Sequence, residues 1–149
     1  MNLTRWLVYE LSALAGPPLN GSFVLFAPAA SGSNHYNFRS FGTTGLNTGT
    51  LVVENFPAPH SAVLRGIGGI STNTCELLIN GGYKRSASIS QGTGNYGNYP
   101  LFIGRRGGTS LPFNGHLYSL IGIGNLVSDE DTVLLEKLMA LKTGVTLNA

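Results

Sequence analysis

Side chains that could carry catalysis are few in this sequence, and they are dispersed. Cleavage of a glycosidic bond needs two carboxyl groups roughly 5–10 Å apart on either side of that bond. Between residues 11 and 128 the only acidic residues are Glu54 and Glu76, which fall on different expected strands. The histidines (His35, His60 and His116) have no acid close in sequence, so no serine–histidine relay is indicated. We therefore expect a protein that is not an enzyme, with a glycan-cleaving enzyme as the least favoured alternative.

Residues 92–97, GTGNYG, match the G-x-G-x-x-G pattern of dinucleotide-binding sites. Such a site requires a helix that opens directly on the motif, because the helix N-terminus holds the pyrophosphate. Here Pro100 and a further apolar segment follow the motif, so we interpret it as a glycine-rich loop and expect no cofactor.

Metal ligands are equally sparse. Asp129 and Asp131 are close together, but both fall in the first turn of an expected helix, where carboxylates favour the helix dipole. The single cysteine, Cys75, excludes an intrachain disulfide and a multi-cysteine zinc site, and its alternating surroundings predict a buried thiol. We expect no bound metal.

Basic residues are densest at Arg105 and Arg106, with Lys84 and Arg85 on an expected hairpin nearby. Arginine beside aromatic rings can bind nucleic acid or acidic sugars, although a solvated turn is the simpler interpretation. The chain has nine Lys or Arg and seven Asp or Glu, and this net charge of +2 favours only mild attraction to polyanions. We expect no specific nucleic-acid partner.

Composition indicates the elements that must position these side chains. Gly accounts for 21 of the 149 residues and charged residues for 11%, against usual shares of about 7% and about 25%. This mixture excludes coiled coils and helical bundles, and 42% hydrophobic residues argue against disorder. We expect a single all-β domain over residues 1–149. No apolar run approaches the ~20 residues that span a bilayer, so no membrane span is expected.

Short apolar or alternating segments predict about nine strands between residues 4 and 123. These strands are expected at residues 6–11, 22–27, 36–41, 49–53, 61–68, 75–79, 83–89, 101–103 and 115–123. The clearest local signal is the Asn80-Gly81 pair, which accepts the positive φ angles of a tight hairpin turn.

One helix is expected over about residues 129–142, between an N-cap at Ser128 and a C-cap at Gly144. Its apolar residues recur on one face, which indicates that this face packs onto the edge or back of the sheets. The apolar face consists of Val133, Leu134, Leu138 and Leu141, with Met139 beside them.

The second half of the chain resembles a known family. Residues 92–108, GTGNYGNYPLFIGRRGG, and 111–121, LPFNGHLYSLI, resemble the last third of laminin-G-like, concanavalin A-like jelly-roll domains. In that family an (Y/F)IG-R strand precedes an F-N-G-x-(I/L)-Y strand and a helix ending in K-T-G-V, here residues 142–145. LLING at 77–81 resembles the family's hairpin, and the Arg-Arg-Gly-Gly loop is similar to that of proteins from tailed bacteriophages and prophages.

The resemblance implies an antiparallel jelly-roll β-sandwich that is shortened at its N-terminus, with one C-terminal amphipathic helix. Either the early strands are missing, or a neighbouring subunit or another polypeptide completes the sheets. An open sheet edge favours association, so a homo-oligomer or contact with other virion subunits is expected.

The resemblance further implies a non-catalytic structural or adhesion module of a phage virion, made in the cytoplasm of the host bacterium. It would bind carbohydrate or a host surface through its loops and an oligomer interface. The alternative is a capsid-decorating or assembly protein whose function is oligomerisation. Because aromatic and arginine side chains dominate recognition surfaces, the expected contact residues are Tyr96, Tyr99, Arg105, Arg106, Asn114 and His116.

Overall fold

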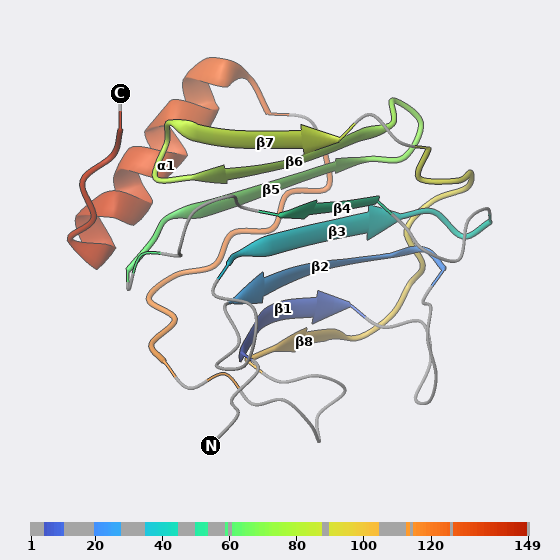
Figure 1. Ribbon diagram of the computed structural model, residues 1–149, viewed down its shortest axis with the longest axis horizontal. Helices are drawn as coiled ribbons and strands as arrows, with labels where there is room; N and C mark the ends of the chain where they lie inside the picture. Colours follow the sequence, from blue (N-terminus) through green and yellow to red (C-terminus); the bar gives the residue numbers. More distant parts are fainter. Residues whose placement is uncertain are drawn as a thin grey trace.

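The computed structural model describes residues 5–10, 20–27, 35–44, 50–53, 59, 61–87, 90–104, 113, 115–125 and 127–148. Within these ranges the chain forms eight strands and one C-terminal helix (Figure 1). The elements are β1 (Arg5–Glu10), β2 (Ser22–Ala27), β3 (Asn37–Phe41), β4 (Thr50–Val53), β5 (Leu64–Gly69), β6 (Thr74–Ile79), β7 (Tyr83–Ala87), β8 (Leu101–Ile103) and α1 (Asp129–Thr143). A strand-rich chain with one C-terminal helix is thus confirmed, and the eight strands lie within a few residues of their predicted positions.

The strands form two antiparallel sheets. One has five strands in the order β4-β3-β2-β1-β8, and the other has three in the order β5-β6-β7. Consecutive strands pair within each sheet, whereas β8 returns after β7 to pair with β1, with Val8 opposite Ile103. The predicted β6–β7 hairpin is confirmed, because Asn80 and Gly81 have φ angles of 53° and 79°.

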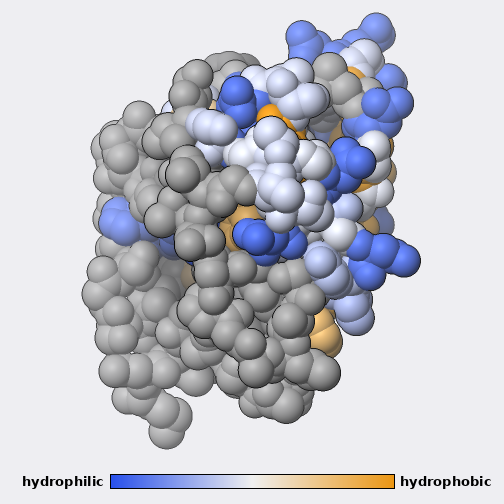
Figure 2. Space-filling view, turned by 90° about the vertical axis from the view of Figure 1, so that its right-hand side faces the viewer, coloured by the Kyte–Doolittle hydropathy of each residue, from blue (hydrophilic) through white to orange (hydrophobic). Residues whose placement is uncertain are grey.

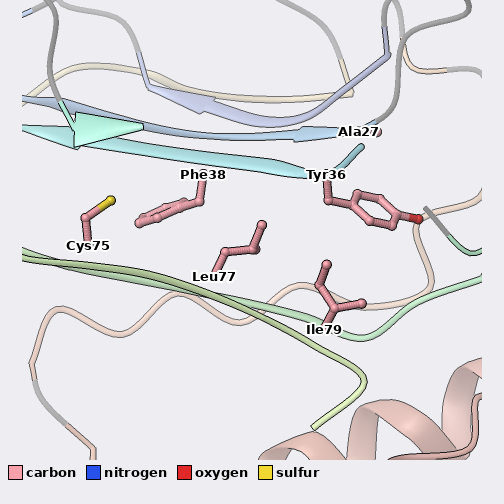
Figure 3. Close-up of a cluster of buried hydrophobic side chains, with 6 residues drawn as sticks. All are labelled: Ala27, Tyr36, Phe38, Cys75, Leu77 and Ile79. Atoms are coloured by element: carbon pink, nitrogen blue, oxygen red, sulfur yellow. The ribbon is translucent and has the colours of Figure 1, made fainter. Parts of the chain in front are cut away.

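The two sheets face each other across a hydrophobic core. Figure 3 shows Tyr36 and Phe38 projecting from the five-stranded sheet toward Leu77 and Ile79 of the other sheet. Cys75, Leu77 and Ile79 of β6 lie on the core face because every second side chain of a strand lies on the same face. Each of these side chains is at least nine-tenths buried, which stabilises the fold by roughly 1.5–3 kcal/mol per large apolar residue.

Glycine on β5 allows the sheets to approach closely. A Cβ atom at Gly66 would lie 2.5 Å from the ring of Phe38, so the ring occupies the place where a side chain would otherwise stand. The position is therefore closed to any residue larger than glycine unless Phe38 moves.

The helix begins and ends where its caps predict. The Ser128 Oγ accepts a hydrogen bond from the Asp131 N–H at 3.1 Å, and Gly144 adopts a φ of 69° and donates to the Ala140 carbonyl at 2.9 Å. Figure 3 shows α1 on the side of the three-stranded sheet that faces away from the five-stranded sheet.

The prediction that the apolar face of α1 packs onto a sheet is wrong. Val133, Leu134, Leu138 and Leu141 are exposed, and the buried helix residues are Glu136 and Ala140. The inward face instead carries an ion pair, in which the Glu136 carboxylate lies 3.4 Å from the Arg65 Nε on β5. A buried charge without its partner is destabilising, so this pair favours the observed rotation of the helix.

The strand predicted over residues 115–123 is also wrong, because this segment has no regular secondary structure. Within the described part of the chain, no backbone hydrogen bond joins it to a strand, and a lone strand is not stable without one. Its large apolar residues are exposed instead of contributing to the core. These residues are Leu117, Tyr118, Leu120, Ile121 and Ile123.

Cys75 provides a test of the core. The side chain is fully buried, as predicted, and this burial raises the pKa of its thiol to about 12 from an ordinary value of 9.0. The native thiol is therefore expected to resist a chromogenic thiol reagent at about pH 8 and to react once the protein is unfolded.

The same shift predicts how stability depends on pH. The fold disfavours the thiolate. The contribution of Cys75 to the free energy of unfolding is therefore complete below pH 9.0 and is lost as the pH rises toward about 12. In the labelling test, rapid stoichiometric reaction of the native Cys75 thiol with the reagent at about pH 8 would contradict its buried position.

Candidate functional site

Four connections meet at one end of the two sheets, on the right in Figure 1 and facing the viewer in Figure 2. We call this surface the loop end, and it comprises residues 20–21, 42–44, 70–73 and 90–99. None of these residues is charged, and apart from Ile70 they are Gly, Ser, Thr, Asn, Gln and Tyr. The described atoms in Figure 2 accordingly show a mostly hydrophilic surface.

Backbone hydrogen bonds hold the loops of this end together. The Gly42 N–H donates to the Gln91 carbonyl at 2.7 Å, and Thr44 and Thr93 exchange N–H to carbonyl bonds of 3.1 and 2.7 Å. The hydroxyl groups of the two threonines also contact each other. The Gly97 N–H donates to the Gly21 carbonyl at 2.7 Å. These bonds hold the loops in one arrangement relative to one another.

Gln91 is a central member of the loop end that the sequence did not single out. It is almost completely buried, and its Nε2 donates to the carbonyls of Gly69 and Thr74 at 2.9 and 2.8 Å. Its own N–H donates to the Asn73 Oδ1 at 3.3 Å. One side chain therefore joins the β5–β6 turn to the loop that precedes β8.

Tyr96 points into the protein. Its hydroxyl lies 2.6 Å from the Oγ of the fully buried Ser40, and its ring meets Phe23 edge-on with centroids 5.6 Å apart. A Cβ atom at Gly68 would overlap the Tyr96 hydroxyl, so the absence of a side chain there makes room for it. Tyr96 closes the core at the loop end and is only half-exposed.

Tyr99 is the second predicted contact residue at the loop end. Its ring lies against Gly97, where a Cβ atom would overlap it, and the side chain is half-buried. Of the other predicted contacts, His116 is exposed in the 115–125 segment, with its ring 6.1 Å from that of Tyr118. Arg105, Arg106 and Asn114 lie outside the described residues. The structure thus brings together Tyr96 and Tyr99, and it places His116 elsewhere.

Groups suited to catalysis do not gather in the described part of the chain. Glu76 lies on β6 between the inward-facing Cys75 and Leu77, so it belongs to the face of that sheet away from the core. Glu54 is outside the described residues. Among the residues described, no three His, Cys, Asp or Glu side chains lie close enough to hold a metal ion. Nor does the described chain contain a helix that is both long and apolar enough to cross a membrane.

Comparison with known proteins gives no relative. No protein-family model, curated protein or solved structure matches this chain.

Removal of the Tyr96 hydroxyl tests its role at the loop end. Tyr96→Phe leaves the buried Ser40 Oγ without this partner, and we expect the free energy of unfolding to fall by about 1–3 kcal/mol in urea denaturation. Tyr99→Phe is the matched control and is expected to change stability by less than about 0.5 kcal/mol. Equal losses in the two variants would contradict the inward position of Tyr96.

Gly68→Ala tests the same contact from β5. The new methyl group would overlap the Tyr96 hydroxyl and lie 2.6 Å from the Ser40 Oγ, so we expect a loss of about 1–3 kcal/mol. The loss should be smaller in a Tyr96→Phe background, because the overlapping hydroxyl is absent there. Strictly additive losses would show that Gly68 and Tyr96 do not contact each other.

Proposed function

We propose that this protein is a non-catalytic adhesion module of a phage particle that binds neutral carbohydrate at its loop end. The observation that carries the proposal is the uncharged, hydroxyl- and amide-rich composition of that surface. A sugar hydroxyl both donates and accepts hydrogen bonds, and side-chain amides and hydroxyls do the same. Neutral polyhydroxylated ligands therefore fit this surface better than anions or cations do.

Exposed polar groups and an aromatic ring lie close together in one loop. Thr93, Asn95 and Asn98 are exposed, and Tyr99 keeps part of its ring accessible beside them. An aromatic ring offers an apolar body to the C–H face of a sugar, while the amides offer donors and acceptors to its hydroxyls. The fixed backbone bonds of the loop end reduce the entropy lost when a ligand orders these groups.

The assignment to a phage particle rests on sequence motifs. Residues 77–81, 92–108 and 111–121 resemble laminin-G-like jelly-roll domains of phage structural proteins. Two facing antiparallel sheets support such a relationship. The return of β8 to the side of β1 supports it too, because a strand returns in this way in a Greek key.

A second candidate function is assembly, in which oligomerisation itself is the role. The observation that favours it is the distribution of apolar side chains. Among the described residues, most of the exposed large hydrophobic side chains lie on α1 and on the 115–125 segment, which contacts α1 through Ser119 and Lys142. Such a concentration marks a surface that a partner covers.

An array of neutral glucans, mannans and galactans, with heparin as the polyanionic comparison, tests the proposal. We expect binding to a neutral glycan that falls about tenfold or more in Asn95→Ala/Asn98→Ala and about fivefold in Tyr99→Ala, since each lost contact costs about 1 kcal/mol. Asn148→Ala, an exposed asparagine beside the β6–β7 turn, is the matched control and should bind normally.

Salt separates this mode of binding from attraction between charges. The affinity should be unchanged between about 0.01 M and about 1 M salt, although the screening length falls from roughly 30 to roughly 3 Å. The proposal fails if no neutral glycan binds, or if heparin alone binds and salt abolishes it.

A further inference from the structure

The outward face of α1 is an apolar stripe at helical spacing. Leu134, Leu138 and Leu141 recur at intervals of four and three residues, and their exposed fractions are 58%, 46% and 84%. Val133 flanks them and is also exposed. The helix has 15 residues, which gives the stripe room along a rod about 22 Å long. No described part of the chain covers these side chains.

The opposite face of α1 is fixed to the body of the protein. Glu136 is 8% exposed and pairs with Arg65, and Ala140 is buried on the same side of the helix. Beside the stripe, at the C-terminal end of the helix, the Lys142 Nζ donates to the Ser119 Oγ at 3.4 Å. Rotating the leucines inward would break the ion pair and leave Arg65 without its partner. The stripe is therefore held outward.

We infer that two copies of this chain associate by packing their α1 stripes against each other with the helices antiparallel. The charge pattern of the helix supports a second copy as the occupant. The first turn is acidic (Asp129, Glu130 and Asp131), whereas the basic residues Lys137 and Lys142 lie in its second half. An antiparallel pair places acidic turns beside basic ones and opposes the helix dipoles, whereas a parallel pair brings like charges together.

The register of the leucines agrees with the charges. When Leu134 of one copy faces Leu138 of the other, Asp131 comes beside Lys142 of the second copy, and the twofold symmetry repeats the contact. Asp131 and Lys142 are about three helical turns apart, so they lie on the same side of the stripe and meet across an antiparallel pair. Apolar packing and ion pairing thus select the same arrangement.

The neighbouring 115–125 segment extends this surface. The contact between Ser119 and Lys142 places the segment beside α1, and its residues Leu117, Tyr118 and Leu120 are exposed. A helix pair would therefore have further apolar side chains close to its C-terminal halves.

The first experiment measures mass by light scattering during size exclusion over a series of protein concentrations. We expect wild type to be a dimer and Leu138→Ser to be monomeric at concentrations where wild type is dimeric. Leu101→Ser is the matched control, because Leu101 on β8 is 48% exposed against 46% for Leu138, and it should remain dimeric. An unreactive Cys75 thiol in each variant shows that the fold is intact.

The second experiment exchanges charges. Asp131→Lys and Lys142→Asp should each weaken dimerisation about tenfold or more, because each homodimer then opposes like charges twice. An equimolar mixture should dimerise again, since each copy supplies the charge that the other lacks. Loss of helix stability alone would not be repaired by mixing.

The oligomeric state tests this inference independently of carbohydrate binding. A monomeric wild type at all concentrations overturns the inference, as does an oligomer that Leu138→Ser leaves intact or charge variants that mixing does not rescue. Binding of glycan by the loop end should persist in Leu138→Ser, so failure of the dimer and failure of the adhesion proposal are separate results.

Discussion

The architecture depends on the absence of side chains at two places on β5. Gly66 lies under the ring of Phe38, and Gly68 lies under the hydroxyl of Tyr96. The first contact brings the two sheets to their packing distance, and the second lets a loop residue close the end of the core. Core and loop end are therefore linked, since both use the space left by alternate residues of one strand.

A single ion pair has a comparable influence on the other side of the three-stranded sheet. Arg65 alternates with the two glycines on β5, so it faces away from the core and meets Glu136 of α1. Because this carboxylate is buried beside Arg65, the ion pair favours the observed rotation of the helix. β5 thus organises the core on one face, and on the other it determines the surface that α1 presents.

Local signals in the sequence predicted local structure well. The Asn80-Gly81 turn, the Ser128 cap and the Gly144 cap depend on a few adjacent residues, and the structure has all three. The rotation of α1 could not be predicted in this way, because it depends on Arg65, far away in the chain. Tyr96 and Tyr99 look alike in sequence, and only Gly68 and Ser40 explain why Tyr96 turns inward. Hydrophobic content likewise predicted a strand at 115–123, but hydrophobicity alone supplies no hydrogen-bonding neighbour.

The pairing of β8 with β1 has a consequence for synthesis. Val8 leaves the ribosome long before Ile103, its partner in the sheet, so the outer edge of β1 stays unpaired while most of the chain is being made. Pairings between residues so distant in sequence form slowly, because closing a long loop costs entropy before the contact forms. The unpaired edge of β1 during that interval is the kind of surface that recruits other strands, so the nascent chain depends on rapid shielding until the fifth strand of the sheet arrives.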